Sequence, residues 1–289
     1  QGADESPAAG GGVSLPKSLR GTAVYVPGYE PKAAGMAVSV GASRPRFARN
    51  IANPKKPYRL LTRIGMDGKV TQALLPAWAH DVKIAPDNSV GVLCGFEARD
   101  HVAFDPVTLD LVATAPSFTE GWMGGGHAAF LGSGSTVLMS ERAPRPVREG
   151  PLEKHFGRIT VRDAKTLRIR DSYSSYGVDP HDIRPIDNEK YLVIANYGSL
   201  PRADRTDFAV PRHVVEACVA IIDLRNGKLV DKIVTSAADT ELRHLAAGGL
   251  DRIFAIQARL APDASGGQTY WLEAMQGQTD ITSEPGIIY

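Results

Sequence analysis

Four histidines occupy the same place in successive copies of a repeated sequence pattern. Each precedes a short strand-like run and a turn, as in HDVKIAPDNS, HAAFLGSGS and HDIRPIDNE, and they recur at intervals of roughly 50 to 60 residues. They are His80, His127, His181 and His244. Neutral imidazole is the commonest side-chain ligand of copper, iron, zinc and nickel. We therefore predict that these four side chains converge and bind a transition-metal ion, copper or iron, with zinc as a further candidate.

Acidic residues accompany the histidines. Asp81 and Asp182 directly follow two of them, and Glu141 ends the second strand-like run of its repeat. The aspartates could accept hydrogen bonds from imidazole N–H groups and so fix ring orientation, whereas Glu141 could also be a direct metal ligand. Two alternatives stay open. In one the histidines only tie neighbouring repeats together, and in the other they act as acids and bases without a metal.

The histidines and cysteines outside this pattern carry weaker signals. His101, His155 and His213 fall in outer or loop positions of the repeats, so we expect them at the surface. Cys94 and Cys218 stand far apart and form no CxxC motif. We expect two buried free thiols, or one incidental bridge, and no thiolate zinc site.

The elements that must position the histidines are short strands. Apolar residues alternate with polar ones, and turn signals interrupt them every eight to twelve residues or so. Each repeat contains a first strand at the histidine, a hairpin, a second strand, and an outer hairpin whose turn holds PVTL, AKTL or RNGK. Such units bury both faces only by stacking around a channel. The sequence predicts an all-β fold, a β-propeller of four-stranded blades, of which five are readable.

Composition limits the class of protein and its compartment. The chain of 289 residues carries 33 Lys and Arg against 32 Asp and Glu, so we expect no nucleic-acid partner. No apolar run has the length of a transmembrane segment. We expect a disordered or extended N-terminal segment over residues 1–19, where the first dozen residues are small and polar, and a single propeller domain over 20–289. The start at Gln1 suggests a removed signal peptide and a periplasmic or extracellular location, although artificial truncation would leave a similar start.

Several segments of the repeats also resemble a known family. They are GHAAF followed by SER, PHDIRPIDNEKYLVIANYG, VAIIDLRNGKLV and RHLA, in this order over residues 72–258, and the most specific stretch is 179–198. The chain is similar to an uncharacterised family of exported bacterial YVTN or quinoprotein-like β-propellers. Their genes commonly lie beside those of imelysin-type iron-uptake proteins and of a dihaem peroxidase-like protein.

The resemblance implies a seven-bladed periplasmic propeller connected with metal acquisition. The family's blade-start histidines correspond to the four histidines above, and its glutamate after the second strand corresponds to Glu141. The family's last two blades are not recognisable after Arg259. No reaction is established for this family.

Three functional hypotheses therefore stand side by side. The first is a periplasmic propeller that binds metal through the histidine ring, in iron or copper handling, with a metal-transport or redox protein as candidate partner. The second is an enzyme at the same channel mouth, a metal-dependent oxidoreductase or a lactonase-like hydrolase, which would need an open metal position. The third is a scaffold that binds another protein through its long loops.

Overall fold

A computed structural model of the chain describes residues 23–27, 46–53, 55–56, 58–79, 81–96, 98–144, 151–201, 212–235, 240–262, 268–270 and 285–288. Across these ranges the regular elements are β-strands and two short 3-10 helices, η2 (Arg46–Ala48) and η3 (Leu152–His155). None of the helices in the described part of the chain could cross a membrane. The predicted N-terminal segment 1–19 lies outside the described residues, and the single domain over 20–289 stays a prediction.

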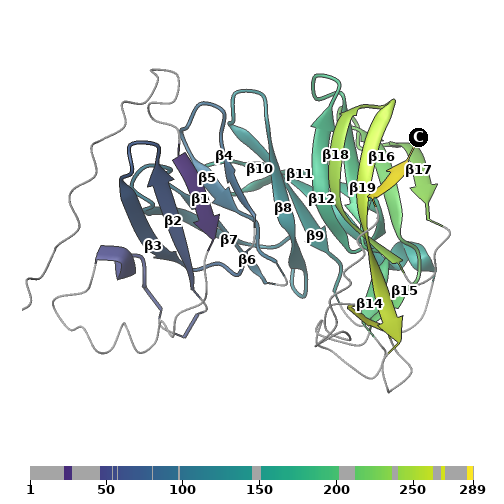
Figure 1. The fold of residues 1–289 in the computed structure, drawn as a ribbon, viewed down its shortest axis with the longest axis horizontal. Helices are drawn as coiled ribbons and strands as arrows, with labels where there is room; N and C mark the ends of the chain where they lie inside the picture. Colours follow the sequence, from purple (N-terminus) through teal and green to yellow (C-terminus); the bar gives the residue numbers. More distant parts are fainter. Residues whose placement is uncertain are drawn as a thin grey trace, which may run out of the picture.

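The strands form a row of antiparallel sheets that follows chain order from β1 at one end to β19 at the other (Figure 1). The first sheet contains β1 (Ala23–Pro27), β2 (Arg59–Gly65) and β3 (Val70–Leu75). The second contains β4 (Val82–Ile84), β5 (Gly91–Leu93), β6 (Asp100–Phe104) and β7 (Leu111–Pro116). The third contains β8 (Met123–Leu131), β9 (Thr136–Arg142), β10 (Phe156–Asp163) and β11 (Ile169–Val178).

The remaining strands complete the row. The fourth sheet contains β12 (Pro180–Ile186), β13 (Tyr191–Asn196), β16 (Cys218–Asp223) and β17 (Leu229–Val234). The fifth contains β18 (Thr240–Gly249) and β19 (Arg252–Pro262), with β14 (Ser199–Pro201), β15 (Arg212–Val214), β20 (Gln268–Tyr270) and β21 (Pro285–Ile288). The predicted β-propeller is confirmed, and the five described sheets match the five readable blades. The second, third and fourth sheets have the predicted four strands, whereas the first has three described strands and the fifth has six. The seven blades that the resemblance implies stay a prediction.

A turn of the same type recurs in the outer hairpins of three sheets. Asp163 and Asp223 end the third strand of a sheet, and Asp105 directly follows one. Each accepts hydrogen bonds from backbone N–H groups two or three residues on. Such Asx turns are local in sequence, which is why the repeat is readable. In each turn one residue takes a positive φ, and these residues are Leu109, Leu167 and Gly227.

The core lies between neighbouring sheets. One apolar cluster joins the third and fourth sheets through buried side chains such as Leu138, Ile159, Ile183 and Ile194. Similar clusters join the second sheet to the third and the fourth to the fifth. Because the sheets pack face to face, their first strands come together, and β12 lies between β8 and β18. This arrangement carries the histidines to one place.

Candidate metal centre

Three of the predicted histidines lie inside the first strands of three successive sheets, where each strand is irregular. His127 is in β8, His181 in β12 and His244 in β18. The pairing register shifts between Gly124 and Ala128, between Pro180 and Ile183, and between Leu242 and Leu245. The sequence placed these histidines just ahead of the strands. They lie within them because each strand takes up extra residues as a bulge, which redirects a side chain out of the regular alternation.

The three imidazoles form a close cluster. Their ligand atoms all lie within 4.8 Å of one another. Nε2 of His127 is 3.2 Å from Nε2 of His181, and the ring of His244 is centred 5.2 Å and 5.1 Å from the other two rings. His127 and His181 are buried, whereas His244 is exposed. The structure thus brings together three of the four predicted histidines, and His80 lies outside the described residues.

The second ring nitrogen of each buried histidine faces an oxygen. Nδ1 of His181 is 2.6 Å from the carbonyl oxygen of Gly125. Nδ1 of His127 is 3.2 Å from Oδ2 of Asp81 and 3.5 Å from Oδ1 of Asp182. The Nδ1–H of His181 donates to that carbonyl oxygen, and an Nδ1–H on His127 would face the two carboxylates, which is the tautomer that leaves both Nε2 lone pairs available to a metal ion. In that tautomer the two lone pairs face each other across 3.2 Å, and a cation or a shared proton between them would offset their repulsion.

The spacing fits a metal ion. A tetrahedral ion bound to imidazole nitrogens at about 2.0–2.1 Å holds those nitrogens roughly 3.3–3.4 Å apart. The measured 3.2 Å between the two Nε2 atoms is close to that separation. A proton shared between the two rings would also relieve the repulsion, but it would leave the third ring, His244, without a part in the cluster.

Asp182 fixes the cluster between two sheets. Its buried carboxylate accepts hydrogen bonds from the backbone N–H of Ile183 at 2.9 Å and from that of Leu245, also at 2.9 Å. Leu245 directly follows His244, so the same carboxylate that faces His127 also anchors the strand that carries the third imidazole. The predicted orienting role of Asp182 therefore has a structural basis.

Asp81 is the second carboxylate beside His127. Burial alone would raise its pKa, but the hydrogen bond and charge of His127, together with Lys83, lower the pKa to about 2. Asp81 is thus ionised at neutral pH. An ionised acceptor facing Nδ1 favours the ring orientation and tautomer that a metal requires.

Two positioning residues were not predicted from the sequence. The hydroxyl of Ser140 donates to the backbone oxygen of His181 at 2.8 Å and lies 3.1 Å from that of His127, and so holds the two strands together. At Gly125 a Cβ atom would lie 2.2 Å from the carbonyl oxygen of Pro180, so the two first strands can approach only because this residue is glycine. The GGG run before His127 was the available signal.

Gly125→Ala is expected to lower the free energy of unfolding by about 1–3 kcal/mol, because the added methyl group forces β8 away from β12. Urea denaturation measures this loss. Gly248→Ala is the matched control, since its Cβ would meet only ordinary contacts at 3.9 Å. Equal losses in both variants would contradict the close approach at Gly125.

Glu141, predicted as a metal ligand, lies in a different network. Its fully buried carboxylate accepts hydrogen bonds from Thr160 Oγ1 at 2.6 Å and from Arg162 Nη2 at 2.6 Å, and the backbone N–H of Phe118 donates to its other oxygen. The end of β9 directs this side chain toward the second sheet and away from the three imidazoles. The structure does not bring Glu141 into the cluster.

The expectation that His101 lies at the surface is wrong. His101 is 0% exposed, and its Nδ1 accepts a hydrogen bond from the backbone N–H of Gly95 at 3.0 Å. Its Nε2 lies 3.5 Å from Oε1 of Glu141. The residue is buried because β6 packs against the third sheet, where it meets the carboxylate. His155, at the end of η3, is only partly buried, in line with the expectation.

The network around Glu141 predicts a loss of stability in acid. Burial would raise the pKa of Glu141, but hydrogen bonds and charges from His101, Arg162 and Thr160 lower it from 4.5 to about 2. Because the folded-state pKa is the lower one, the stabilisation is complete above about pH 4.5 and is lost as the pH falls toward 2. The loss is on the order of 3 kcal/mol. Urea midpoints measured between pH 7 and pH 2.5 test it, and a Glu141→Gln variant that showed the same pH dependence would contradict it.

The two cysteines are both free and buried, as the sequence suggested. Burial is the largest cause that raises the pKa of the Cys218 thiol, to about 12, and it also raises that of Cys94. Neither thiol is a thiolate at neutral pH, and neither belongs to the histidine cluster.

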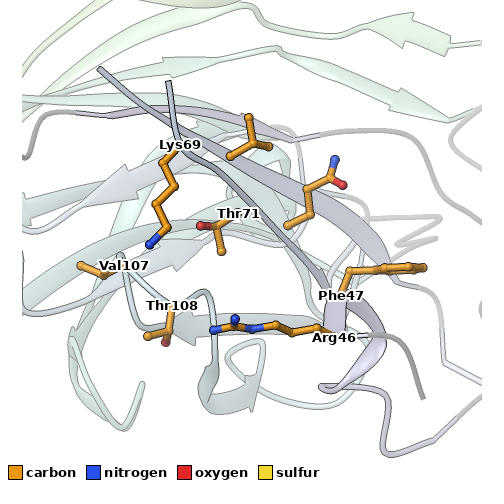
Figure 2. A pocket seen from close by; sticks show the side chains of 8 residues that line it. Arg46, Phe47, Lys69, Thr71, Val107 and Thr108 are labelled. Carbon is orange, nitrogen blue, oxygen red and sulfur yellow. The ribbon is translucent and has the colours of Figure 1, made fainter. Parts of the chain in front are cut away.

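A cavity of about 380 Å³ lies at the other end of the row, on the first sheet. Figure 2 shows Arg46 and Lys69 reaching into it, with Thr71 and Thr108 between them. Its lining contains no histidine, cysteine or carboxylate, so it has none of the side chains that bind transition metals. The cavity is separate from the three imidazoles.

Comparison with known proteins supports a family assignment. Residues 73–277 match the family described as "Protein of unknown function (DUF1513)", a stretch that includes all four predicted histidines. No curated protein matches the chain significantly. Among solved structures, the chain is similar to "Structure of Dos1 propeller", at 13% identity and a TM-score of 0.44 over 70% of this chain. The match covers 49% of that chain, so it spans about half of its length.

Proposed function

This chain belongs to the DUF1513 family, whose description names no activity, and we propose from its own geometry that it is a β-propeller that binds a divalent transition-metal ion. The ligands are Nε2 of His127 and of His181, together with the exposed imidazole of His244. We further propose a periplasmic role in iron or copper handling. A metal-transport or redox protein of that compartment is the candidate partner.

The 3.2 Å separation of the two Nε2 atoms carries this proposal. Both Nδ1 atoms face oxygens, so both lone pairs point into the same space. Burial of His127 and His181 makes that repulsion costly unless a cation is present. A site made of imidazoles without thiolate suits copper, iron or zinc, and copper and iron agree with the resemblance noted from the sequence.

An enzymatic role is the second candidate, and the exposure of His244 favours it. Three protein ligands with one solvent-facing side are the arrangement of catalytic metal sites, which keep a position for water or substrate. The role of His80 distinguishes a metal-storage or metal-transfer protein from an enzyme. If His80 is a fourth ligand, the coordination sphere is full and supports storage or transfer. If it is not, an open position remains for chemistry.

Metal titration of the chelator-treated protein tests the proposal. Calorimetry with Cu²⁺, Zn²⁺ and, without oxygen, Fe²⁺ is expected to give one strong site in the wild type. His127→Ala and His181→Ala are each expected to weaken binding about 100-fold or more. His155→Ala, outside the cluster, is the matched control and should bind as the wild type does.

Two results would overturn the proposal. A wild-type protein that takes up none of these ions, or variants that bind as tightly as the wild type, would leave the histidines a structural role only. Circular dichroism of each variant checks that it is folded. A His80→Ala variant with reduced affinity would add His80 to the ligand set.

A further inference from the structure

Each carboxylate beside the histidines already has a cationic partner. Nζ of Lys83 lies 3.1 Å from Oδ2 of Asp81, and Nη2 of Arg184 lies 3.1 Å from Oδ2 of Asp182. The two negative charges are thereby offset by two positive charges. Neutral imidazole ligands carry no charge. The positive charge of a divalent ion bound to them would therefore not be balanced by the protein groups that the structure describes.

A third cation lies next to the exposed imidazole. Arg243 precedes His244 in β18, and its guanidinium is centred 5.3 Å from the ring of Tyr197, which itself lies 4.5 Å from the ring of His181. Arg243 is also paired, with Glu241 at 3.1 Å. Oδ2 of Asp182, the atom that Arg184 contacts at 3.1 Å, also accepts a hydrogen bond from the backbone N–H of Leu245, the residue after His244. The guanidinium of Arg184 therefore lies beside the strand that carries the exposed imidazole.

Arg184 has one hydrogen-bond donor without a partner among the described residues. Its Nη2 is used by Asp182, but its Nε is buried and has no hydrogen-bond partner among the residues that the structure describes. A buried N–H group without a partner costs free energy, and the planar guanidinium fork matches a carboxylate or another oxyanion. The side chain as a whole is 39% exposed although Nε is buried, so a small solute can reach the terminal part of the guanidinium from solvent.

We infer that a small oxyanion binds at the solvent-facing side of the metal centre, where one oxygen ligates the ion beside His244 and Arg184 donates to the anion. This inference rests on the proposed function, because the metal ion supplies the charge that the anion balances. Arg243 adds to the attraction without direct contact. The shared chemistry is a negatively charged oxygen on a compact group, as in carboxylates, bicarbonate and phosphate.

Anion titrations of the Cu²⁺-loaded protein test the inference. Azide, which gives a charge-transfer band on Cu²⁺, is added first as the probe, and acetate, bicarbonate and phosphate are then added separately to displace it. Displacement by acetate and bicarbonate alone would indicate planar oxyanions, and displacement by phosphate would indicate a tetrahedral one. Arg184→Gln is expected to weaken azide and oxyanion binding about tenfold.

Substitutions at Arg184 distinguish an effect on anion binding from an effect on metal binding. Arg184→Gln should not weaken Cu²⁺ binding, because Asp182 then loses its cationic partner and adds negative charge near the ion. Arg184→Lys keeps the charge but loses the fork, so its anion affinity should fall between those of wild type and Arg184→Gln. Arg225→Gln, at a side chain 73% exposed in the turn after β16, is the matched control and should behave as the wild type does.

Each failure points to a different cause. If the wild type binds no Cu²⁺, the proposed function is wrong. If Cu²⁺ binds but neither azide nor any oxyanion changes its spectrum, the anion site is wrong while the metal site stands. If anions bind equally well to wild type, Arg184→Gln and Arg184→Lys, the assignment to Arg184 is wrong.

Discussion

Replacing Glu141 with alanine is expected to lower the free energy of unfolding by about 3–5 kcal/mol. Glu141 and Arg162 are both buried, and the carboxylate is the anionic partner of the guanidinium. Its removal leaves the Arg162 charge in the protein interior, although Arg162 still donates to the backbone oxygens of Leu167 and Pro116. Urea denaturation followed by circular dichroism measures the loss.

Two controls show whether the effect comes from this network. Glu141→Gln keeps the shape and a hydrogen-bond acceptor but removes the charge, so it should cost less than alanine does. Glu153→Ala, at an exposed position in η3, should change stability by no more than about 0.5 kcal/mol. A loss as small at Glu141 as at Glu153 would contradict the assignment of a structural ion pair.

The Glu141 variants also test the limits of the metal centre. The carboxylate lies in the network of Thr160, Arg162 and His101, so a folded Glu141→Gln protein should bind metal as tightly as the wild type. Weaker metal binding by this variant would indicate that Glu141 is a metal ligand, as the sequence predicted. The same protein preparation can therefore answer a structural and a functional question.

The repeat and the convergence of histidines were predictable because both depend on local signals. The aspartate turns at Asp105, Asp163 and Asp223 fix the outer hairpins by hydrogen bonds to residues two or three positions away. Once their phase is known, stacking of equal units places His127 and His181 near each other. No long-range information is needed for that step.

Glu141 and His101 could not be assigned because both faces of a blade are buried. Strand alternation tells which side chains share a face, but it does not tell whether a polar one meets the channel or the neighbouring sheet. His101 was placed outside for the same reason, since its position in β6 is covered by the third sheet. Only the packed structure pairs these two residues.

The bulges were the other feature that the sequence did not reveal. The extra residues at the histidines, two in β8 and one each in β12 and β18, leave no clear signature in the pattern of apolar residues, yet they determine where each imidazole points. Ser140 was also not predicted, because its role depends on the backbone oxygens of two histidines from different strands. Positioning residues of this kind follow from the pairing of strands and cannot be predicted before that pairing is known.

Metal binding is expected to stabilise the whole row of sheets. At a free metal concentration 100 times the dissociation constant, the free energy of unfolding should rise by about 2.7 kcal/mol, because the ion binds the folded state only. For a chain of this size that is a rise of roughly 4–5 °C in Tm. Differential scanning calorimetry with and without one of the ions measures it, and a chelator should reverse it.

The stabilisation must depend on three sheets at once. His127, His181 and His244 come from β8, β12 and β18, so an ion that they share links the third, fourth and fifth sheets. The double variant His127→Ala/His181→Ala should show no rise in Tm, whereas His155→Ala should show the full rise. A proton shared between His127 and His181 would give no dependence on metal in any variant. An equal rise in the double variant would place the ion elsewhere in the protein, and the three imidazoles would then be left with the structural role alone.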